Sequence, residues 1–66
     1  MEITVNGQLH QVHENDTILQ LIRTLGLENK RLAVEMNLTI VPRSQFETCI
    51  LTQGDKIEIV QAIGGG

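Results

Sequence analysis

The sequence predicts an α+β fold in which one main helix packs on one face of a mixed sheet of four to five strands. Two observations carry this prediction. Apolar and polar residues alternate near the beginning, in the middle and at the end of the chain, as is typical of half-buried strands. Between the first two of these regions, one segment has apolar residues at helical spacing. With 66 residues, the chain is expected to form a single domain, residues 1–66.

The composition is that of a small globular protein. Hydrophobic residues make up 41% of the chain and charged residues 20%, which argues against disorder. The sequence holds one Phe and no Tyr or Trp, so the core must be aliphatic and bases would find few aromatic faces for stacking. The net charge is −3 and the basic residues form no stripe. Nucleic acid is therefore not expected as a partner, and a basic patch on another protein fits better.

Residues 1–12 are predicted to form a β-hairpin. Ile3 and Val5 alternate with polar residues, and Asn6-Gly7 is a strong turn signal because both residues tolerate positive φ. The second strand is expected at about residues 8–12. Leu9 and Val12 are three apart and would face opposite sides of a regular strand, so either the loop is longer than two residues or a bulge is present. The sequence leaves both alternatives open.

Residues 17–25 are predicted to form the main helix. Thr17 with Gln20 fits a capping box, and Asp16 is the alternative N-cap. Gly26 fits the left-handed position after the helix, which places Leu27 against Ile22 in a Schellman motif. The apolar face has the spacing i, i+3, i+4, i+7 and consists of Ile18, Leu21, Ile22 and Leu25.

The second half of the chain returns to strand character. The alternating segment 31–36 is expected to be a strand, Asn37-Leu38 a turn, and residues 40–41 a short strand that Pro42 ends. A short helical turn should follow, with Phe46 and Ile50 buried.

Gly54 and Asp55 are expected to turn the chain into the final strand. That strand should place Ile57, Ile59 and Ile63 on one face and Val60 and Ala62 on the other. The first hairpin leads into the helix, and the final strand can lie centrally beside the first strand. This arrangement is the β-grasp, or ubiquitin-like, fold.

The side chains offer no convincing catalytic group. His10 and His13 are three apart on a predicted strand, so they would point to opposite faces and could pair on a metal only if the backbone were irregular. Cys49 is the only cysteine, and a small apolar filler is favoured over a nucleophile. No metal site and no enzymatic activity of its own are expected.

The end of the chain carries the most distinctive feature, the glycines Gly64, Gly65 and Gly66. Residues without Cβ can thread a channel too narrow for side chains and present the Gly66 carboxylate to another protein's active site. The binding energy would come from elsewhere, and we expect Val60, Ala62 and Ile63 to be the docking residues. A frayed terminus remains the alternative reading of the glycines.

The sequence also bears on where the protein works. The first residues have neither the basic nor the apolar region of a signal peptide, and no apolar stretch approaches the ~20 residues of a membrane span. A single cysteine fits a reducing compartment. A cytoplasmic protein that does not contact the membrane is the expectation.

Four segments together resemble the ThiS family, the sulfur carriers of thiamin biosynthesis. They are "MEITVNGQ", "DTILQLIRTLGL", "VEMNLTIVPRSQF" and "GDKIEIVQAIGGG", and the resemblance covers essentially all 66 residues. The resemblance implies that an adenylyltransferase of the ThiF type, related to ubiquitin-activating enzymes, adenylates the Gly66 carboxylate with Mg-ATP. Sulfur from a cysteine desulfurase or a rhodanese-type donor then replaces AMP, which leaves a thiocarboxylate.

Thiazole synthase of the ThiG type would take that sulfur while it builds the thiazole ring. The resemblance thus implies that Gly66 bears the sulfur, that Gly64 and Gly65 thread the partners' active sites, and that the chain itself binds no cofactor. Three alternatives remain: the small subunit of molybdopterin synthase, a ubiquitin-like modifier, and an interaction module without sulfur transfer. The short length and the single Phe argue against the first.

Overall fold

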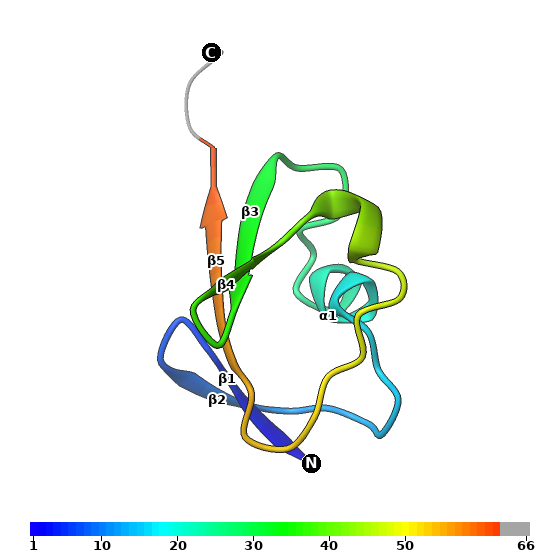
Figure 1. Cartoon of the computed structure of the whole chain (residues 1–66), viewed down its shortest axis with the longest axis vertical. Helices are drawn as coiled ribbons and strands as arrows, with labels where there is room; N and C mark the ends of the chain where they lie inside the picture. Colours follow the sequence, from blue (N-terminus) through cyan, green and yellow to red (C-terminus); the bar gives the residue numbers. More distant parts are fainter. Residues whose placement is uncertain (63–66) are drawn as a thin grey trace.

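The computed structural model describes residues 1–62, in which a five-stranded mixed sheet has one α-helix on one face (Figure 1). The strand order is β2-β1-β5-β3-β4, and the final strand is central as predicted. The elements are β1 (Glu2–Val5), β2 (Gln8–Gln11), α1 (Ile18–Thr24), β3 (Leu32–Met36), β4 (Thr39–Val41), a 3₁₀ turn η1 (Arg43–Gln45) and β5 (Lys56–Gln61). The predicted β-grasp architecture is confirmed.

The first hairpin has a two-residue turn, formed by Asn6 at φ 50° and Gly7 at φ 83°. Positive φ at both positions matches the right-handed twist of the strands. The expected longer loop or bulge is wrong. Leu9 pairs with Thr4 on the face away from the helix and is 70% exposed, whereas Val12 follows the end of β2 and packs against the core from the other face. One apolar residue is simply left in solvent, which a small domain tolerates.

Helix α1 has the predicted caps. The Gln20 backbone N–H donates to the Thr17 hydroxyl at 3.2 Å, and the Thr17 N–H donates to the Gln20 side chain at 2.8 Å, so the capping box forms. Asp16 is not the N-cap, because its carboxylate accepts the His13 N–H instead. At the other end the Leu27 N–H donates to the Ile22 carbonyl at 3.0 Å, as in a Schellman motif.

The segment between β3 and β5 contains one correction. The turn Asn37-Leu38 and the short strand β4 are as predicted, and Phe46 after η1 is buried. Ile50, however, is 52% exposed, and its neighbour Leu51 is buried instead. Ile50 makes an isolated β-bridge to Thr17 at the helix start, which turns its side chain outward and the next one inward.

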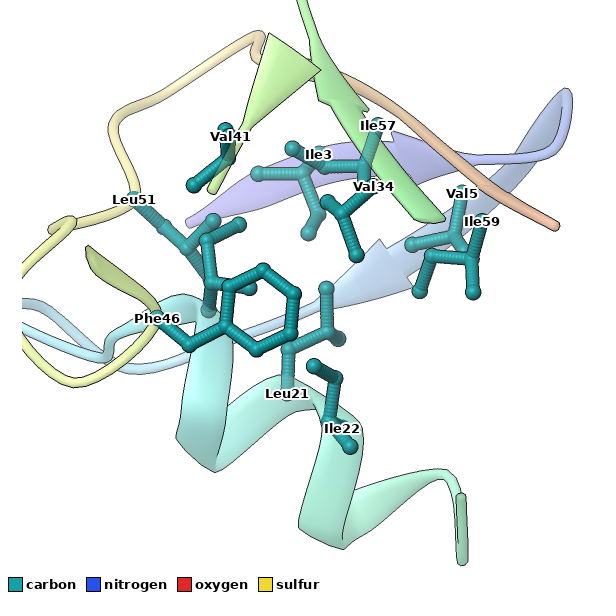
Figure 2. Packing of buried hydrophobic residues seen from close by; sticks show 11 residues of the cluster. Ile3, Val5, Leu21, Ile22, Val34, Val41, Phe46, Leu51, Ile57 and Ile59 are labelled. Atoms are coloured by element: carbon teal, nitrogen blue, oxygen red, sulfur yellow. The ribbon is translucent and has the colours of Figure 1, made fainter. Parts of the chain in front are cut away.

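The core lies between the sheet and α1 and is aliphatic apart from Phe46 (Figure 2). Burial of these side chains is the main source of stability in a domain this small. The buried hydrophobic residues are Ile3, Val5, Ile18, Leu21, Ile22, Val34, Val41, Phe46, Leu51, Ile57 and Ile59. None of the helices in the described part of the chain is long and apolar enough to cross a membrane.

Candidate functional site

The central strand β5 is the element that carries the chain toward its end. It is antiparallel to β3 over Ile57–Gln61 and parallel to β1 only at Lys56 and Ile57, so both edges are paired at its beginning and one edge at its end. It runs toward the end of the molecule opposite to Met1 (Figure 1). The ladder with β3 therefore supports the part of β5 from which the chain continues.

The outer face of the sheet, away from the helix, holds the two described residues that we predicted to dock a partner. Val60 is 64% exposed and lies opposite Ala33 of β3, which is also exposed. Ala62 follows β5, is exposed, and continues the ladder by donating its N–H to the Arg31 carbonyl at 2.9 Å. We call the surface formed by Val60, Ala62 and Ala33 the docking patch. Ile63, the third predicted docking residue, lies outside the described residues.

Two carboxylates adjoin the docking patch. Glu58 and Glu35 are directly opposite each other on β5 and β3, on the same outer face as Val60. Like charges in such a pair repel and cost stability. Ile40, on the far side of Glu35 in β4, is 62% exposed. The outer face near the end of β5 is therefore apolar, with these carboxylates on one side and the exposed Arg31, opposite Ala62, on the other. The carboxylates suit a partner surface that carries positive charge.

The opposite side of the strand end is hollowed. The hollow lies between the first hairpin, β5 and the loop after α1, and Gln61 lines it. The other lining residues are Val5, Asn6, Gln8, His10, Leu25, Leu27 and Ile59. The end of β5 thus has two different sides, an apolar surface outside and a mixed hollow inside.

The groups that we considered for side-chain chemistry are scattered. His10 pairs with Ile3 at the edge of the core, whereas His13 is exposed and its Nδ1 lies 3.7 Å from an Asp16 carboxylate oxygen. Within residues 1–62, no three His, Cys, Asp or Glu side chains are arranged to hold a metal ion. Cys49 is partly buried, with its Sγ 3.9 Å from Met36 Sδ. Burial, and then the charge of Asp55, raise the pKa of its thiol, which disfavours the reactive thiolate.

The three predicted tail residues, Gly64, Gly65 and Gly66, lie outside the described residues. Sequence reasoning missed Ala33 as part of the docking patch. Alternation of apolar and polar residues places Ala33 on the polar side of its strand. Its position opposite Val60 depends on the register of β3 against β5, which the sequence does not reveal.

Comparisons with known proteins agree with this architecture. The model of the ThiS family matches residues 2–66. The sulfur carrier protein ThiS of Escherichia coli is 35% identical over 66 residues, and the match covers 100% of both chains. A crystal structure of the thiamine biosynthesis protein ThiS from Geobacter metallireducens superposes with a TM-score of 0.84 at 29% identity and covers 100% of both chains.

A longer relative also contains a segment similar to this chain. A thiazole synthase of Paramagnetospirillum magneticum is 39% identical over 66 residues, and the match covers 100% of this chain. The chain spans about a fifth of the length of that relative, 20%. The family model and the full-length match to the Escherichia coli protein agree in both sequence and length, and the chain therefore belongs to the ThiS family.

Proposed function

We propose that this protein is a sulfur carrier of thiamin biosynthesis and that the Gly66 carboxylate bears the sulfur. The observation that carries the proposal is the match to the ThiS family over residues 2–66, in a chain whose central strand leads into three glycines. The printed names of its relatives, a sulfur carrier protein and a thiazole synthase, support the same pathway.

The proposed chemistry has two steps, because a carboxylate is a poor acyl donor. An oxygen of the Gly66 carboxylate attacks the α-phosphorus of ATP in a ThiF-type adenylyltransferase, and pyrophosphate leaves. A sulfur nucleophile then attacks the acyl carbon, and AMP leaves. With sulfide as the nucleophile the product is a thiocarboxylate. ATP and Mg²⁺ are held by the partner, and this chain supplies the docking patch and the tail.

The docking patch fits this division of labour. Val60 and Ala33 offer an apolar contact close to the start of the tail, and Glu58 beside them favours a partner with positive charge. We propose that the adenylyltransferase binds here while Gly64 and Gly65 pass into its active site. The similarity to a segment of thiazole synthases supports a ThiG-type enzyme as the sulfur acceptor. A cysteine desulfurase or rhodanese-type protein is the proposed donor. Its cysteine persulfide attacks the acyl carbon with loss of AMP, and a thiol then cleaves the S–S bond of the acyl disulfide, which releases the thiocarboxylate and leaves a disulfide on the donor. The cytoplasm is the proposed location.

Intact-mass spectrometry tests the proposal. The protein is incubated with a ThiF-type adenylyltransferase, Mg-ATP and sodium sulfide, and we expect the mass change of one oxygen replaced by sulfur. A variant lengthened by one alanine after Gly66 is the matched control and should keep its mass. If the mass stays unchanged while the same enzyme preparation thiolates its own carrier, the proposal is wrong.

The choice between thiazole and molybdopterin supply needs a genetic test. Deletion of the gene should create a requirement for the thiazole moiety and leave molybdoenzyme activity intact. The opposite result would assign the protein to molybdopterin synthesis.

A further inference from the structure

The side chain of Asn6 takes the place of a strand residue. The Asn6 backbone N–H donates to the Ile57 carbonyl at 2.9 Å, as the last backbone contact between the first hairpin and β5. Its side-chain amide then continues the pattern, because Oδ1 accepts the Ile59 N–H at 2.8 Å and Nδ2 donates to the Ile59 carbonyl at 3.2 Å. One side chain thus satisfies both backbone groups of a residue beyond the reach of β1.

Beyond Ile59 the support of β5 becomes one-sided. Residues 60 and 62 direct their backbone groups toward β3, as the bond from the Ala62 N–H to the Arg31 carbonyl shows. Gln61 therefore directs its backbone groups to the other side, into the hollow beside Asn6. Within residues 1–62, Asn6 makes the last hydrogen bonds to β5 on that side.

We infer that Asn6 is a positioning residue that fixes the last part of β5, the strand from which the C-terminal tail has to be delivered. This inference rests on the proposed function, because it concerns delivery of the Gly66 carboxylate. By holding Ile59 on both backbone groups, Asn6 fixes the course of β5 up to Val60, so the docking patch has a fixed relation to the end of the strand. Without it, Gln61 and Ala62 are held by β3 alone, and ordering one further residue when the partner binds corresponds to roughly tenfold in an equilibrium constant.

The chain contains a matched control at the other end of the same strand. Asn37, like Asn6, begins a two-residue turn with positive φ (52°), and its Oδ1 accepts the Lys56 N–H at 2.9 Å. The substitutions Asn6→Gly and Asn37→Gly each remove an amide and keep the turn, because glycine tolerates positive φ. Only Asn6→Gly removes a hydrogen bond near the C-terminal end of β5. Asn6→Asp is a third variant, which keeps an acceptor for the Ile59 N–H and loses the donor.

The first test needs no partner. We expect Asn6→Gly to speed amide hydrogen exchange at Ile59 by about five- to tenfold, the effect of losing one hydrogen bond, and to lower the NMR order parameters of Gln61 and Ala62. In Asn37→Gly the amide exchange of Lys56 should become faster, whereas the order parameters of Gln61 and Ala62 should equal those of the wild type. Equal order at Gln61 in the wild type and Asn6→Gly would overturn the inference, whether or not the protein carries sulfur.

The second test uses the ThiF-type adenylyltransferase and carrier-dependent pyrophosphate release. Asn6→Gly should lower kcat about tenfold and change the KM for the carrier by less than about twofold, because Val60 and Ala33 still dock while the chain beyond them is misplaced. The kcat of Asn6→Asp should lie between those of Asn6→Gly and the wild type, and the kcat of Asn37→Gly should be within about twofold of the wild-type value. Equal losses in both glycine variants would mean that Asn6 acts only through stability. If the wild type releases no pyrophosphate, the proposed function fails and the NMR test still decides the role of Asn6.

Discussion

The two ends of strand β5 are held by the same kind of side chain and surrounded by different chemistry. At the first end, Asn37 binds Lys56, and the buried carboxylate of Asp55 joins the same network. At the last end, Asn6 binds Ile59, and the neighbouring Val60 is exposed. This strand is therefore anchored by a closed polar network at one end and presents an exposed apolar surface at the other.

Loss of the Asp55 carboxylate should destabilise the domain most, because the network at the first end of β5 depends on it. The Asp55 carboxylate accepts the Thr52 N–H at 2.8 Å, the Thr52 hydroxyl at 3.0 Å and the Asn37 side-chain amide at 3.1 Å. Asp55→Ala leaves these donors without their acceptor and should lower the free energy of unfolding by about 3 kcal/mol. Circular dichroism in urea measures this, since the chain has no Trp or Tyr for fluorescence.

Thr52→Ala is the graded control, because it removes one of the three donors and should cost about 1 kcal/mol. The adenylation rate of both variants should match the wild type under conditions in which they are folded. A loss of less than about 1 kcal/mol in Asp55→Ala would show that water replaces the network and that this end is not the anchor.

The second prediction concerns the last end of β5, where Val60 is exposed in the docking patch. Val60→Asp places a charge in the docking patch, where it would have to be desolvated against the partner, and should lower kcat/KM for adenylation about ten- to hundredfold. Leu9→Asp is the matched control, since Leu9 is similarly exposed on the same face of the sheet but lies on β2, away from the end of β5. Equal losses in both variants would mean that the outer face responds to charge as a whole and that there is no localised patch.

The contrast between the ends also explains how much the sequence could predict. Short sequence patterns were sufficient to predict features that depend only on residues close together in the chain. Asn6-Gly7 predicted the hairpin turn, Thr17 with Gln20 predicted the helix start, and alternation placed Val60 outside, all of which the structure confirms.

What the sequence could not give depends on pairing between distant segments. The contacts of Asn6 with Ile59 join residues 53 apart, and those of Asn37 with Lys56 join residues 19 apart. Asp55 is predicted as an ordinary turn residue, but it is buried and its carboxylate accepts a hydrogen bond from Asn37, 18 residues away in the sequence. The burial of Leu51 in place of Ile50 has the same origin, a bridge to the distant Thr17.

A smaller effect compares the turns that carry the two asparagines. The second residue of the first turn is Gly7 at φ 83°, and that of the other turn is Leu38 at φ 71°. Leucine is strained at positive φ, and Leu38 is 84% exposed and so gains little from burial. Leu38→Gly should therefore raise the free energy of unfolding by about 0.5–1 kcal/mol.

Gly7→Ala is the reciprocal change. An added Cβ at Gly7 meets no atom within 4 Å, so only backbone strain acts, and the variant should lose about 1 kcal/mol. Urea unfolding of both variants measures whether the free energy of unfolding rises in Leu38→Gly and falls in Gly7→Ala. A destabilised Leu38→Gly would show that the leucine side chain has a contact that outweighs its strain.

The smallest effect concerns the carboxylates beside the docking patch. Glu58→Gln removes the repulsion from Glu35 directly opposite and should stabilise the domain by about 0.2–0.5 kcal/mol. The same change should slow association with the adenylyltransferase at low salt, because a charge that steers the encounter is lost, and the difference should vanish at high salt. Glu14→Gln, an exposed carboxylate in the loop before α1, is the control and should change neither quantity. If Glu58→Gln associated faster than the wild type at low salt, the partner surface that meets this end of β5 would have to be acidic, and the charge complementarity proposed for the docking patch would be reversed.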